Sequence, residues 1–451
     1  MNYCRIIRTG CCALLLTIMP FVSQVNAATR AEATSIRLID NNHVPKKIVV
    51  VMTSGTTSFV KNLFTIIKQI NVEENLSSAN RLKLHIIPSG GNPISSLGIS
   101  AEDADKYVEV NPKYSSDDIW AQDCMELCAA RTSGSDTLVP AVFDTNRGRG
   151  LAGLPRALAD LWGLVYALNP SDAEAHGDYG GNIEVTPFDN VMVSGNTITP
   201  ECKSFFEKMG YAGRMFNPDT SWLTVGHIDE SMSFIPTSHV SGGYSIVKAD
   251  PAYALDLVEA ATDADFANLG NDAAFLKRVK AVLSAQRDNP EASTGTPEDD
   301  FIKMNRKIGE IVEKNAGDLK NFIRKVTNDE NREFGEVSWP ALYEGRNGPR
   351  PSGCCAFLPG VVNLTVLGTH LLVPACHFPP FDRIIEARFR AQGNKIHFID
   401  DSAYHTSMGE IHCGTNVLRD LEHTVVTPAR IQAIQRVKER FESLHTTPNL
   451  R

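Results

Sequence analysis

The sequence lacks several patterns that would assign it to a common class of protein. Beyond residue 27, no apolar run approaches the roughly 20 residues needed to cross a bilayer. No HExxH motif is present, and Cys124 and Cys128, the nearest approach to a zinc-binding pair, lack a second pair. No glycine-rich turn has the spacing of a dinucleotide-binding loop or carries a Walker lysine. Because these patterns are missing, the sequence indicates neither a zinc site nor a nucleotide site.

Basic residues are also fewer than acidic ones. The 451 residues include 44 lysines and arginines against 53 aspartates and glutamates, which gives a net charge of −9. Nothing in this balance indicates a nucleic-acid partner, because binding to a phosphate backbone depends on basic side chains. An acidic surface favours basic ligands instead, weakly and in a salt-dependent way. With 42% hydrophobic and 22% charged residues, the composition is typical of a globular protein.

The first 27 residues are predicted to be a secretory signal peptide. Arg5 and Arg8 precede an apolar run from Cys11 to Val22, and residues 25–27 end in a small residue suited to cleavage. The alternative is an uncleaved N-terminal anchor, which the shortness of the apolar run disfavours. We expect the mature chain to be secreted or periplasmic, with no membrane attachment after cleavage.

Cysteine is sparse in the rest of the chain. Three of the ten cysteines fall in the predicted signal, which leaves an odd number for an exported protein. This density is too low for a disulfide scaffold, and an odd number indicates at least one free thiol. For several of the remaining cysteines the simplest interpretation is a reduced, buried side chain.

Helical and strand patterns alternate along most of the chain. Apolar runs rich in β-branched residues, such as 47–52 and 82–87, predict buried strands. Residues 28–45 are polar and are expected to form a linker. Residues 252–335 are rich in Ala, Lys, Glu, Asp and Asn and predict a mainly helical insertion without chemistry of its own. The predicted class is α/β, with a single domain over residues 46–451.

A cysteine late in the chain, Cys413, is a candidate nucleophile. It lies between a histidine and a glycine in the stretch 408–416. A thiol serves as a nucleophile when its surroundings lower the thiol pKa and hold an electrophile over it. The neighbouring His412 is the nearest base in sequence. An extended backbone over 411–413 would point its side chain away from Cys413, so we expect the base to come from elsewhere.

A histidine and two carboxylates earlier in the chain are candidate partners. His227 and Asp229 alternate along a strand predicted over 223–234, so their sidechains are expected to share one face. The alternative is a satisfied structural pair. That alternative must also accommodate an Asp and Trp cluster at 117–126 and two nearby arginines. Two carboxylates beside a thiol suit a planar guanidinium, whose N–H groups they can bind from two sides, and such a cation also favours the thiolate.

Six stretches resemble the catalytic domain of the calcium-dependent protein-arginine deiminases. They are WAQDCME (120–126), FDTNRGRG (143–150), GGNIEVTP (180–187), TVGHIDESMSF (224–234), VLGTHL (366–371) and GEIHCGTNV (409–417). Their order and spacing also match those of the family. The resemblance extends from about Lys46 to about Arg419. It implies the pentein fold of the guanidino-group-modifying superfamily, a five-bladed α/β propeller, here with helical insertions.

The resemblance also implies an activity, the hydrolysis of an arginine guanidinium to citrulline and ammonia through a covalent Cys thiouronium intermediate. Carried onto matching positions, it makes Cys413 the nucleophile and His227 the general acid and base. Asp123 and Asp229 would bind the guanidinium nitrogens. No organic cofactor is needed for this chemistry.

The surroundings of the substrate chain are assigned in the same way. Trp120 would line the channel around the substrate stem. Arg147 and Arg149 match positions near the substrate's peptide backbone, and Arg147 is the better candidate to hold a carbonyl. Ser407 and Met408 stand where the family often has basic residues, which leaves the preference for peptide ends or particular sequences open.

Three kinds of protein fit these features. We expect a deiminase whose partners are arginine-containing peptides or proteins. A deiminase or amidinotransferase for free arginine or agmatine is the alternative enzyme, since it would share the cysteine, histidine and carboxylates. A catalytically inactive, calcium-binding secreted protein is the alternative outside the enzymes.

The family resemblance implies calcium as the cofactor. One site would use the side chains of Gln122, Glu126 and Glu184 and the backbone carbonyls of Gly180 and Ile183, an all-oxygen set of the kind Ca²⁺ takes. An ordinary solvated acid pair is the alternative interpretation of the two glutamates.

A second calcium site of the family is expected to be weak or lost. Asp144 and Thr145 remain from it. Cys124 stands where the family has an acidic residue, and sulfur is a poor calcium ligand. Gly148 replaces a side-chain ligand, so the sequence predicts one bound calcium.

Overall fold

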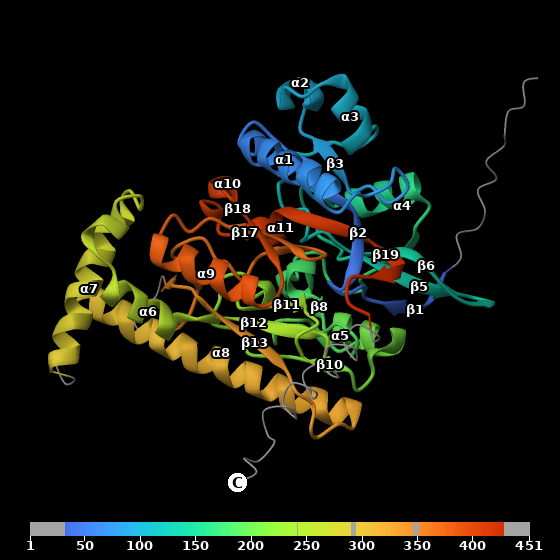
Figure 1. Ribbon diagram of the computed structural model, residues 1–451. Helices are drawn as coiled ribbons and strands as arrows, with labels where there is room; N and C mark the ends of the chain where they lie inside the picture. Colours follow the sequence, from blue (N-terminus) through green and yellow to red (C-terminus); the bar gives the residue numbers. More distant parts are fainter. Residues whose placement is uncertain (1–31, 241, 290–294, 346–350, 428–451) are drawn as a thin grey trace, which may run out of the picture. The chain divides into compact units, whose positions relative to one another are not determined.

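Residues 32–240, 242–289, 295–345 and 351–427 are described by the computed structural model of this chain (Figure 1). They belong to one compact unit that begins at Glu32. The predicted signal peptide, residues 1–27, lies outside the described residues. Within the described part of the chain, no helix is long and apolar enough to cross a bilayer.

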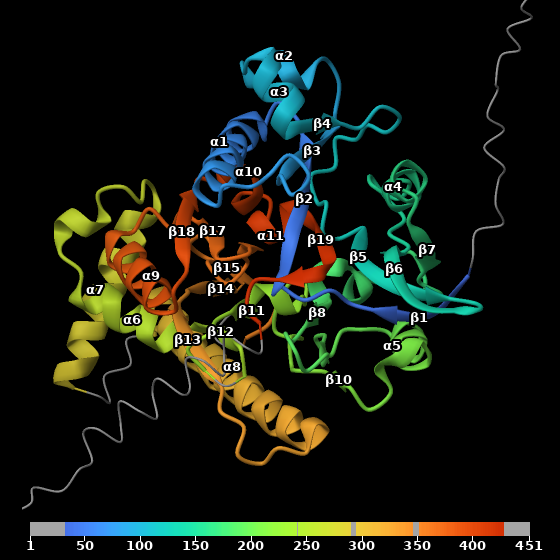
Figure 2. The same ribbon diagram turned by 45° about the vertical axis from the view of Figure 1, so that its right-hand side comes forward.

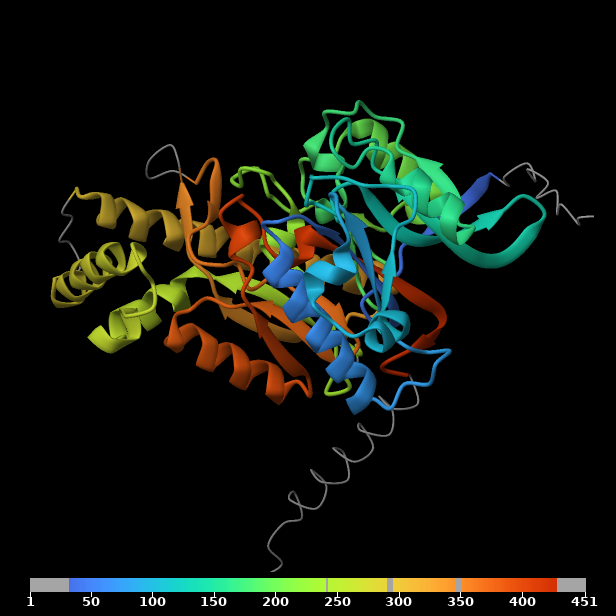
Figure 3. The same ribbon diagram turned by 90° about the horizontal axis from the view of Figure 1, so that it is seen from above.

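Two four-stranded sheets contain the first and last described strands. One has the order β1-β5-β6-β7, with bounds β1 (Ala33–Arg37), β5 (Met125–Thr132), β6 (Ser135–Asp144) and β7 (Val165–Leu168). The other has the order β19-β2-β3-β4, with bounds β19 (Thr415–Thr424), β2 (His43–Met52), β3 (Lys83–Pro88) and β4 (Val108–Val110). β19 and β2 are antiparallel neighbours, drawn as red beside blue in Figure 1, Figure 2 and Figure 3.

The other strands form smaller sheets. One has the order β10-β9-β8, with bounds β8 (Glu184–Val185), β9 (Met192–Val193) and β10 (Met215–Phe216). A second has the order β11-β12-β13, with bounds β11 (Met232–Pro236), β12 (Tyr244–Asp250) and β13 (Gly335–Pro340). A third has the order β16-β17-β18, with bounds β16 (Thr365–Leu367), β17 (His370–Pro374) and β18 (Lys395–Ile399). The strands β14 (Tyr343–Gly345) and β15 (Cys354–Ala356) form an antiparallel pair.

All sheets of three or more strands share one arrangement. Each has an antiparallel pair, namely β5-β6, β8-β9, β11-β12, β16-β17 or β19-β2. The second strand of each pair has a parallel neighbour, namely β7, β10, β13, β18 or β3. A helix connects each of these parallel strands, because a tight turn cannot return the chain to the same end of the sheet. The α/β class predicted from the sequence is confirmed.

Most of the helices that connect these strands begin at a residue suited to the first turn of a helix. They are α1 (Thr57–Glu73), α4 (Leu154–Trp162), α5 (Pro200–Phe206), α6 (Pro251–Ala260), α7 (Asp272–Asp288), α8 (Pro297–Thr327) and α9 (Pro379–Ala391). Proline stands in the first turn of α4, α5, α6, α8 and α9, where its missing N–H removes no helical hydrogen bond. Shorter helices are α2 (Pro93–Leu97), α3 (Ala101–Tyr107) and α10 (Ser402–His405).

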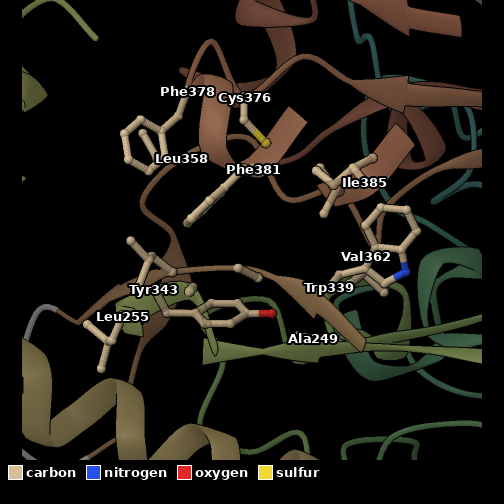
Figure 4. Close-up of a cluster of buried hydrophobic side chains, with 14 of the residues drawn as sticks. Ala249, Leu255, Trp339, Tyr343, Leu358, Val362, Cys376, Phe378, Phe381 and Ile385 are labelled. Carbon is tan, nitrogen blue, oxygen red and sulfur yellow. The ribbon is translucent and has the colours of Figure 1, made fainter. Parts of the chain in front are cut away.

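The segment 252–335 is mainly helical, as predicted, and connects β12 to β13 through α6, α7 and α8. These helices share a large apolar core with β13 and α9, in which Leu255, Trp339 and Phe381 lie together (Figure 4). The Trp339 ring packs against Phe389 with ring centroids 3.9 Å apart. Burying such aromatic side chains favours folding, so this segment supplies stability. Its status as an insertion stays a prediction.

The prediction of a linker over 28–45 is wrong for its described part. β1 pairs with β5 along Ala33–Arg37, and β2 begins at His43. The Ile36 side chain is buried whereas Arg37 is exposed, which is the alternation of an edge strand with one face on the core. A short strand that carries several polar residues resembles a linker in sequence because only a few of its side chains are apolar.

Candidate active site

The predicted nucleophile lies in a single helical turn, α11 (Ile411–Gly414), directly before β19. The extended backbone assumed over 411–413 is therefore wrong. The turn is crowded, since a Cβ on Gly414 would lie 2.3 Å from the Tyr404 ring. Its Cys413 carbonyl accepts a hydrogen bond from the Gln122 N–H at 3.1 Å. This bond joins the turn that holds Cys413 to the stretch 120–126, one of the six that resemble the family.

The Cys413 thiol is buried beside polar groups. Its Sγ lies 3.5 Å from Oδ2 of Asp229 and 3.1 Å from Nδ2 of Asn363. Burial, together with the charges of Asp229 and Asp123, raises the pKa of the Cys413 thiol well above its ordinary value. Without a ligand, the site therefore holds Cys413 as a thiol. No sequence pattern placed Asn363 at this site, because the cysteine that its side chain contacts lies 50 residues away.

His227 and Asp229 do not lie on a strand, so the strand predicted over 223–234 is wrong for this part. His227 precedes a 3-10 turn, Ile228–Glu230, and its backbone N–H donates to Oε1 of Glu230 at 3.1 Å. β11 begins only at Met232. Glu230, which follows His227 and Asp229, supplies an acceptor at the start of the turn, where backbone N–H groups need one.

The His227 ring is held in one tautomer. Its Nε2 donates to the His176 carbonyl at 3.0 Å, because a carbonyl oxygen can only accept. Nδ1 is therefore the nitrogen that takes up or releases a proton, and it lies 3.9 Å from Oδ1 of Asp123. A Cβ on Gly181 would lie 2.6 Å from His227 Nδ1 and 3.0 Å from Oδ2 of Asp229. Only glycine leaves both side chains in place.

The two arginines at 147 and 149 differ in position. The buried Arg147 guanidinium lies 2.9 Å from Oδ2 of Asp118 and 3.6 Å from Oδ2 of Asp123. Burial raises the pKa of the Asp123 carboxyl, and the charges of His227 and Arg147 oppose that effect. Arg147 thus neutralises carboxylates inside the protein. Arg149 lines the cavity at the cysteine, so it replaces Arg147 as the better candidate to hold a substrate carbonyl.

A cavity of about 280 Å³ brings the predicted site residues together. Asp123, His227 and Cys413 line it directly, along with Trp120 and Arg149, while Asp229 contacts Cys413. Further lining residues that the sequence did not single out for this cavity are His176, Tyr179, Thr224, Val225, Glu230 and Gly409, and the previously noted Ser407 and Met408 complete the wall. The cavity offers a nucleophile, a histidine and carboxylates to one small cationic group.

Four of the five predicted calcium ligands line a second, smaller cavity of about 40 Å³: Gln122, Glu126, Ile183 and Glu184. Burial and the negative charge of Glu184 raise the pKa of Glu126 well above its ordinary value. Burial likewise raises the pKa of Glu184, to about 7. Two buried carboxylates that share a cavity need a proton or a cation between them.

Gly180 is the fifth predicted ligand, and it borders the same residues. A Cβ there would lie 2.2 Å from the Gln122 carbonyl and 2.8 Å from Oε1 of Glu126. Among the described residues, no group of three or more His, Cys, Asp or Glu side chains is arranged to hold a metal ion. A cation at this cavity would therefore depend on amide and backbone oxygens as well as on the two glutamates.

The remnants of the second calcium site are engaged within the protein. Oδ2 of Asp144 accepts from the Tyr166 hydroxyl at 2.6 Å. The Thr145 hydroxyl donates to the Asp123 carbonyl at 2.7 Å. Cys124 is a buried thiol 3.5 Å from the Ala121 carbonyl. These contacts leave no open arrangement of oxygens at those residues.

His412 joins the two cavities. Its Nδ1 lies 2.9 Å from Oδ2 of Asp229, and its Nε2 lies 3.7 Å from Oε1 of Glu184. Burial opposes a charge on His412, but the hydrogen bond to Asp229 and the charges of Asp229 and Glu184 raise its pKa overall. The imidazole thus bridges Asp229, which is predicted to bind the substrate guanidinium, and Glu184, a predicted calcium ligand.

A sequence model of the protein-arginine deiminase (PAD) family matches residues 37–424. This chain belongs to the protein-arginine deiminase family. The resemblance drawn from the six stretches is thereby confirmed. The chain is 28% identical over 343 residues to protein-arginine deiminase type-3 of Mus musculus, and 29% identical over 336 residues to protein-arginine deiminase type-1 of Homo sapiens. In both cases 67% of this chain and 46% of the relative are covered, so the chain spans about half the length of these curated relatives.

Solved deiminase structures share the fold of this family member. The agmatine deiminase of C. jejuni has a TM-score of 0.50 at 13% identity, over 85% of this chain and 96% of that one. A putative arginine deiminase from Porphyromonas gingivalis has a TM-score of 0.50 at 12% identity, over 85% of this chain and 98% of that one. At such low identity, the likeness shows the fold alone.

Proposed function

We propose that this chain is a deiminase that hydrolyses the guanidinium of arginine in peptides or proteins to citrulline and ammonia. The observation that carries the proposal is that Cys413, His227 and Asp123 line one cavity and that Asp229 contacts Cys413. Relatives named protein-arginine deiminases support a peptide or protein substrate. The acidic net charge is consistent with a cationic ligand.

The first step is recognition of the guanidinium by Asp123 and Asp229. In the free site these carboxylates and burial hold Cys413 as a thiol. A bound cation reverses the electrostatic effect and favours the thiolate. The carboxylates also fix the guanidinium carbon over the sulfur, which converts a chance encounter into a positioned one. Binding and activation of the nucleophile are thus the same event.

Two chemical steps follow. The Cys413 sulfur forms a bond to the guanidinium carbon, and the carbon–nitrogen bond to the terminal amine breaks as His227 Nδ1 delivers a proton to the departing ammonia. A thiouronium remains on Cys413. Water then attacks the same carbon and gives a proton to His227 Nδ1. The carbon–sulfur bond breaks as the new C–OH group loses its second proton to solvent, and citrulline and the thiolate are released.

We infer that the fold is a five-bladed α/β propeller. The support is the arrangement shared by all sheets of three or more strands, an antiparallel pair with a helix-connected parallel neighbour. The site residues come from segments between different sheets, since Asp123 precedes β5, His227 precedes β11 and Cys413 precedes β19. An experimental structure in which these sheets failed to surround the cysteine would contradict this inference.

The proposed deiminase also includes one bound calcium ion, held by Gln122, Glu126 and Glu184 with the carbonyls of Gly180 and Ile183. The small cavity lined by oxygen-bearing side chains and the mutual repulsion of the two glutamates support this assignment. Bound there, calcium would add to the positive charge of Arg419, which lines the same cavity and acts on both glutamates. The internal hydrogen bonds of Asp144 and Thr145 disfavour a second ion.

Export is proposed on the sequence of residues 1–27. We expect cleavage after Ala27 and release of a secreted or periplasmic enzyme. Mass spectrometry of the N-terminus of the exported protein tests this. An N-terminal peptide that still contains residues 1–27 would instead indicate a retained anchor.

The function is tested by citrulline formation from benzoyl-arginine amide. Wild type is expected to produce citrulline, and Cys413→Ala is expected to produce none above background, because the sulfur forms the covalent intermediate. Free arginine and agmatine are assayed in parallel, and a preference for either would favour the small-guanidine alternative. Absence of turnover by folded, calcium-loaded wild type would favour the non-enzymatic binding protein.

Calcium binding is tested by the melting temperature. Free calcium about 1,000-fold above its Kd is expected to stabilise the wild type by about 4 kcal/mol, which is a shift of several degrees. Glu184→Gln is expected to abolish the shift, whereas Asp144→Asn, at the predicted lost site, is expected to retain it. A melting temperature that is the same in chelator and in calcium would remove the metal from the proposal.

A further inference from the structure

The Cys413 sulfur has two polar side-chain partners besides a backbone hydrogen bond at Glu410, and only one of the two, Asp229, is proposed to bind substrate. Oδ2 of Asp229 is 3.5 Å away, and Nδ2 of Asn363 is 3.1 Å away. In the resting thiol, the S–H can donate to Asp229 while the sulfur accepts from Asn363. Once Asp229 binds the guanidinium, its acceptor oxygens are engaged by the substrate. Asn363 is then the remaining side-chain donor to the sulfur, beside the backbone hydrogen bond at Glu410.

The orientation of the Asn363 amide follows from its other contacts. Its Oδ1 accepts the backbone N–H of Cys413 at 3.2 Å, and an N–H can only donate. The oxygen is therefore on that side, and the NH₂ group faces the sulfur. Asn363 also uses its main chain: its N–H donates to the Gly360 carbonyl, and its carbonyl accepts from the His412 N–H at 3.2 Å.

These bonds hold the amide rigidly. Asn363 is only 2% exposed, so its polar groups are partnered by protein and not by bulk water. Asn363 follows the short turn from Gly360 and lies two residues before the start of β16, so a sheet supports it from one side. A preorganised N–H donor in a buried site stabilises developing negative charge without the cost of reorienting water.

We propose that Asn363 is a catalytic residue of this enzyme, a donor that stabilises the Cys413 thiolate both before attack and when it departs. In the first step the N–H supports the sulfur whose electron pair forms the carbon–sulfur bond. In the second step the carbon–sulfur bond breaks, and the electron pair returns to the sulfur beside the same N–H. The charges of Asp229, Asp123 and Glu230 disfavour the thiolate, whereas the N–H of the uncharged amide favours it. The amide does this without competing for the guanidinium. This role rests on the proposed deiminase function.

Two variants distinguish the loss of the Asn363 N–H donor from the gain of a negative charge beside the sulfur. Asn363→Asp keeps the acceptor for the Cys413 N–H but replaces the donor with a carboxylate oxygen. Asn363→Leu is similar in size and removes the donor without adding charge. Asn71→Asp is the matched control, because Asn71 is buried and likewise accepts one backbone N–H and donates to backbone carbonyls, but in α1 and against Leu82.

The first readout is steady-state turnover of benzoyl-arginine amide. Both Asn363 variants are expected to lose about 100-fold in kcat, the cost of removing one fixed donor from a reacting atom. KM is expected to stay within about threefold, since Asn363 does not line the substrate cavity. Asn71→Asp is expected to leave kcat of the folded fraction unchanged. A kcat for Asn363→Leu close to that of wild type would overturn the proposal.

The second readout needs no substrate. The rate of alkylation by iodoacetamide at pH 8 is measured with Cys413→Ala as the background for other cysteines. A rise of one pKa unit in the thiol lowers the thiolate fraction about tenfold, and we expect at least that loss in both variants. Unchanged alkylation in both would overturn the proposal. If wild type forms no citrulline but the variants alkylate slowly, the deiminase function fails while the donor role at the thiol stands.

Discussion

Asp229→Asn is expected to lower kcat/KM for an arginine substrate by about 10³-fold, since removing one partner of a buried charge pair costs about 3–5 kcal/mol. The variant keeps the shape of the side chain but removes the charge that binds the guanidinium. The same change is expected to make Cys413 react faster with neutral iodoacetamide. Asp229 is the largest of the charges that raise the pKa of the thiol, so its removal lowers that pKa.

The two readouts of Asp229→Asn therefore move in opposite directions, and circular dichroism must show an intact fold, because unfolding would also expose the buried thiol to alkylation. Burial and the Asp229 charge put the thiol pKa above the assay range, so in wild type the alkylation rate is expected to rise steadily between pH 7 and pH 9. In the variant the rise begins at lower pH. Asp189→Asn is the control, because Asp189 is a buried carboxylate paired with Arg332 and Tyr244 outside the cavity. Parallel losses of turnover and alkylation would contradict the assignment.

Gly181→Ala is expected to abolish most activity while the chain still folds. The added Cβ would lie 2.6 Å from His227 Nδ1 and 3.0 Å from Oδ2 of Asp229, so both side chains must move. We expect a loss of at least about 100-fold in kcat, because misplacement of catalytic groups by about 1 Å has that effect. The conflict is with side-chain atoms, so the helix and sheet framework is expected to remain.

Gly317→Ala is the matched control for this substitution. Nothing lies within 4 Å of a Cβ at Gly317, which is inside α8. That variant is expected to retain full activity and to gain about 1 kcal/mol, the usual difference between alanine and glycine in a helix. Activity assays and circular dichroism compare the two. Full activity of Gly181→Ala would show that His227 and Asp229 tolerate displacement.

The sequence predicted which residues share the site better than it predicted their backbone conformation. Asp123, His227 and Cys413 stand in long specific stretches, and the structure places all three on one cavity. The strand expected around His227 and Asp229 is absent. Two polar residues separated by one position fit a strand face and a capped turn equally well, and Glu230, which accepts the His227 N–H, decides for the turn.

Contacts between distant segments were beyond the reach of sequence patterns. Arg147 and Arg149 are two positions apart, yet one is enclosed by Asp118 and Asp123 while the other lines the cavity. Asn363 contacts Cys413 across 50 residues of chain. Such pairings depend on how whole sheets are arranged, whereas apolar periodicity reports only which face of a segment is buried.

The pairing of β19 with β2 also fixes when this site can exist. Cys413 lies just ahead of β19, and β19 takes its place in the sheet beside β2, near the opposite end of the described chain. Contacts between segments so far apart in sequence form late in folding, because a very long loop must close first. A partly synthesised chain would carry the carboxylates and His227 without the sulfur. The proposed activity would thus be absent from any chain in which β19 has not yet paired with β2.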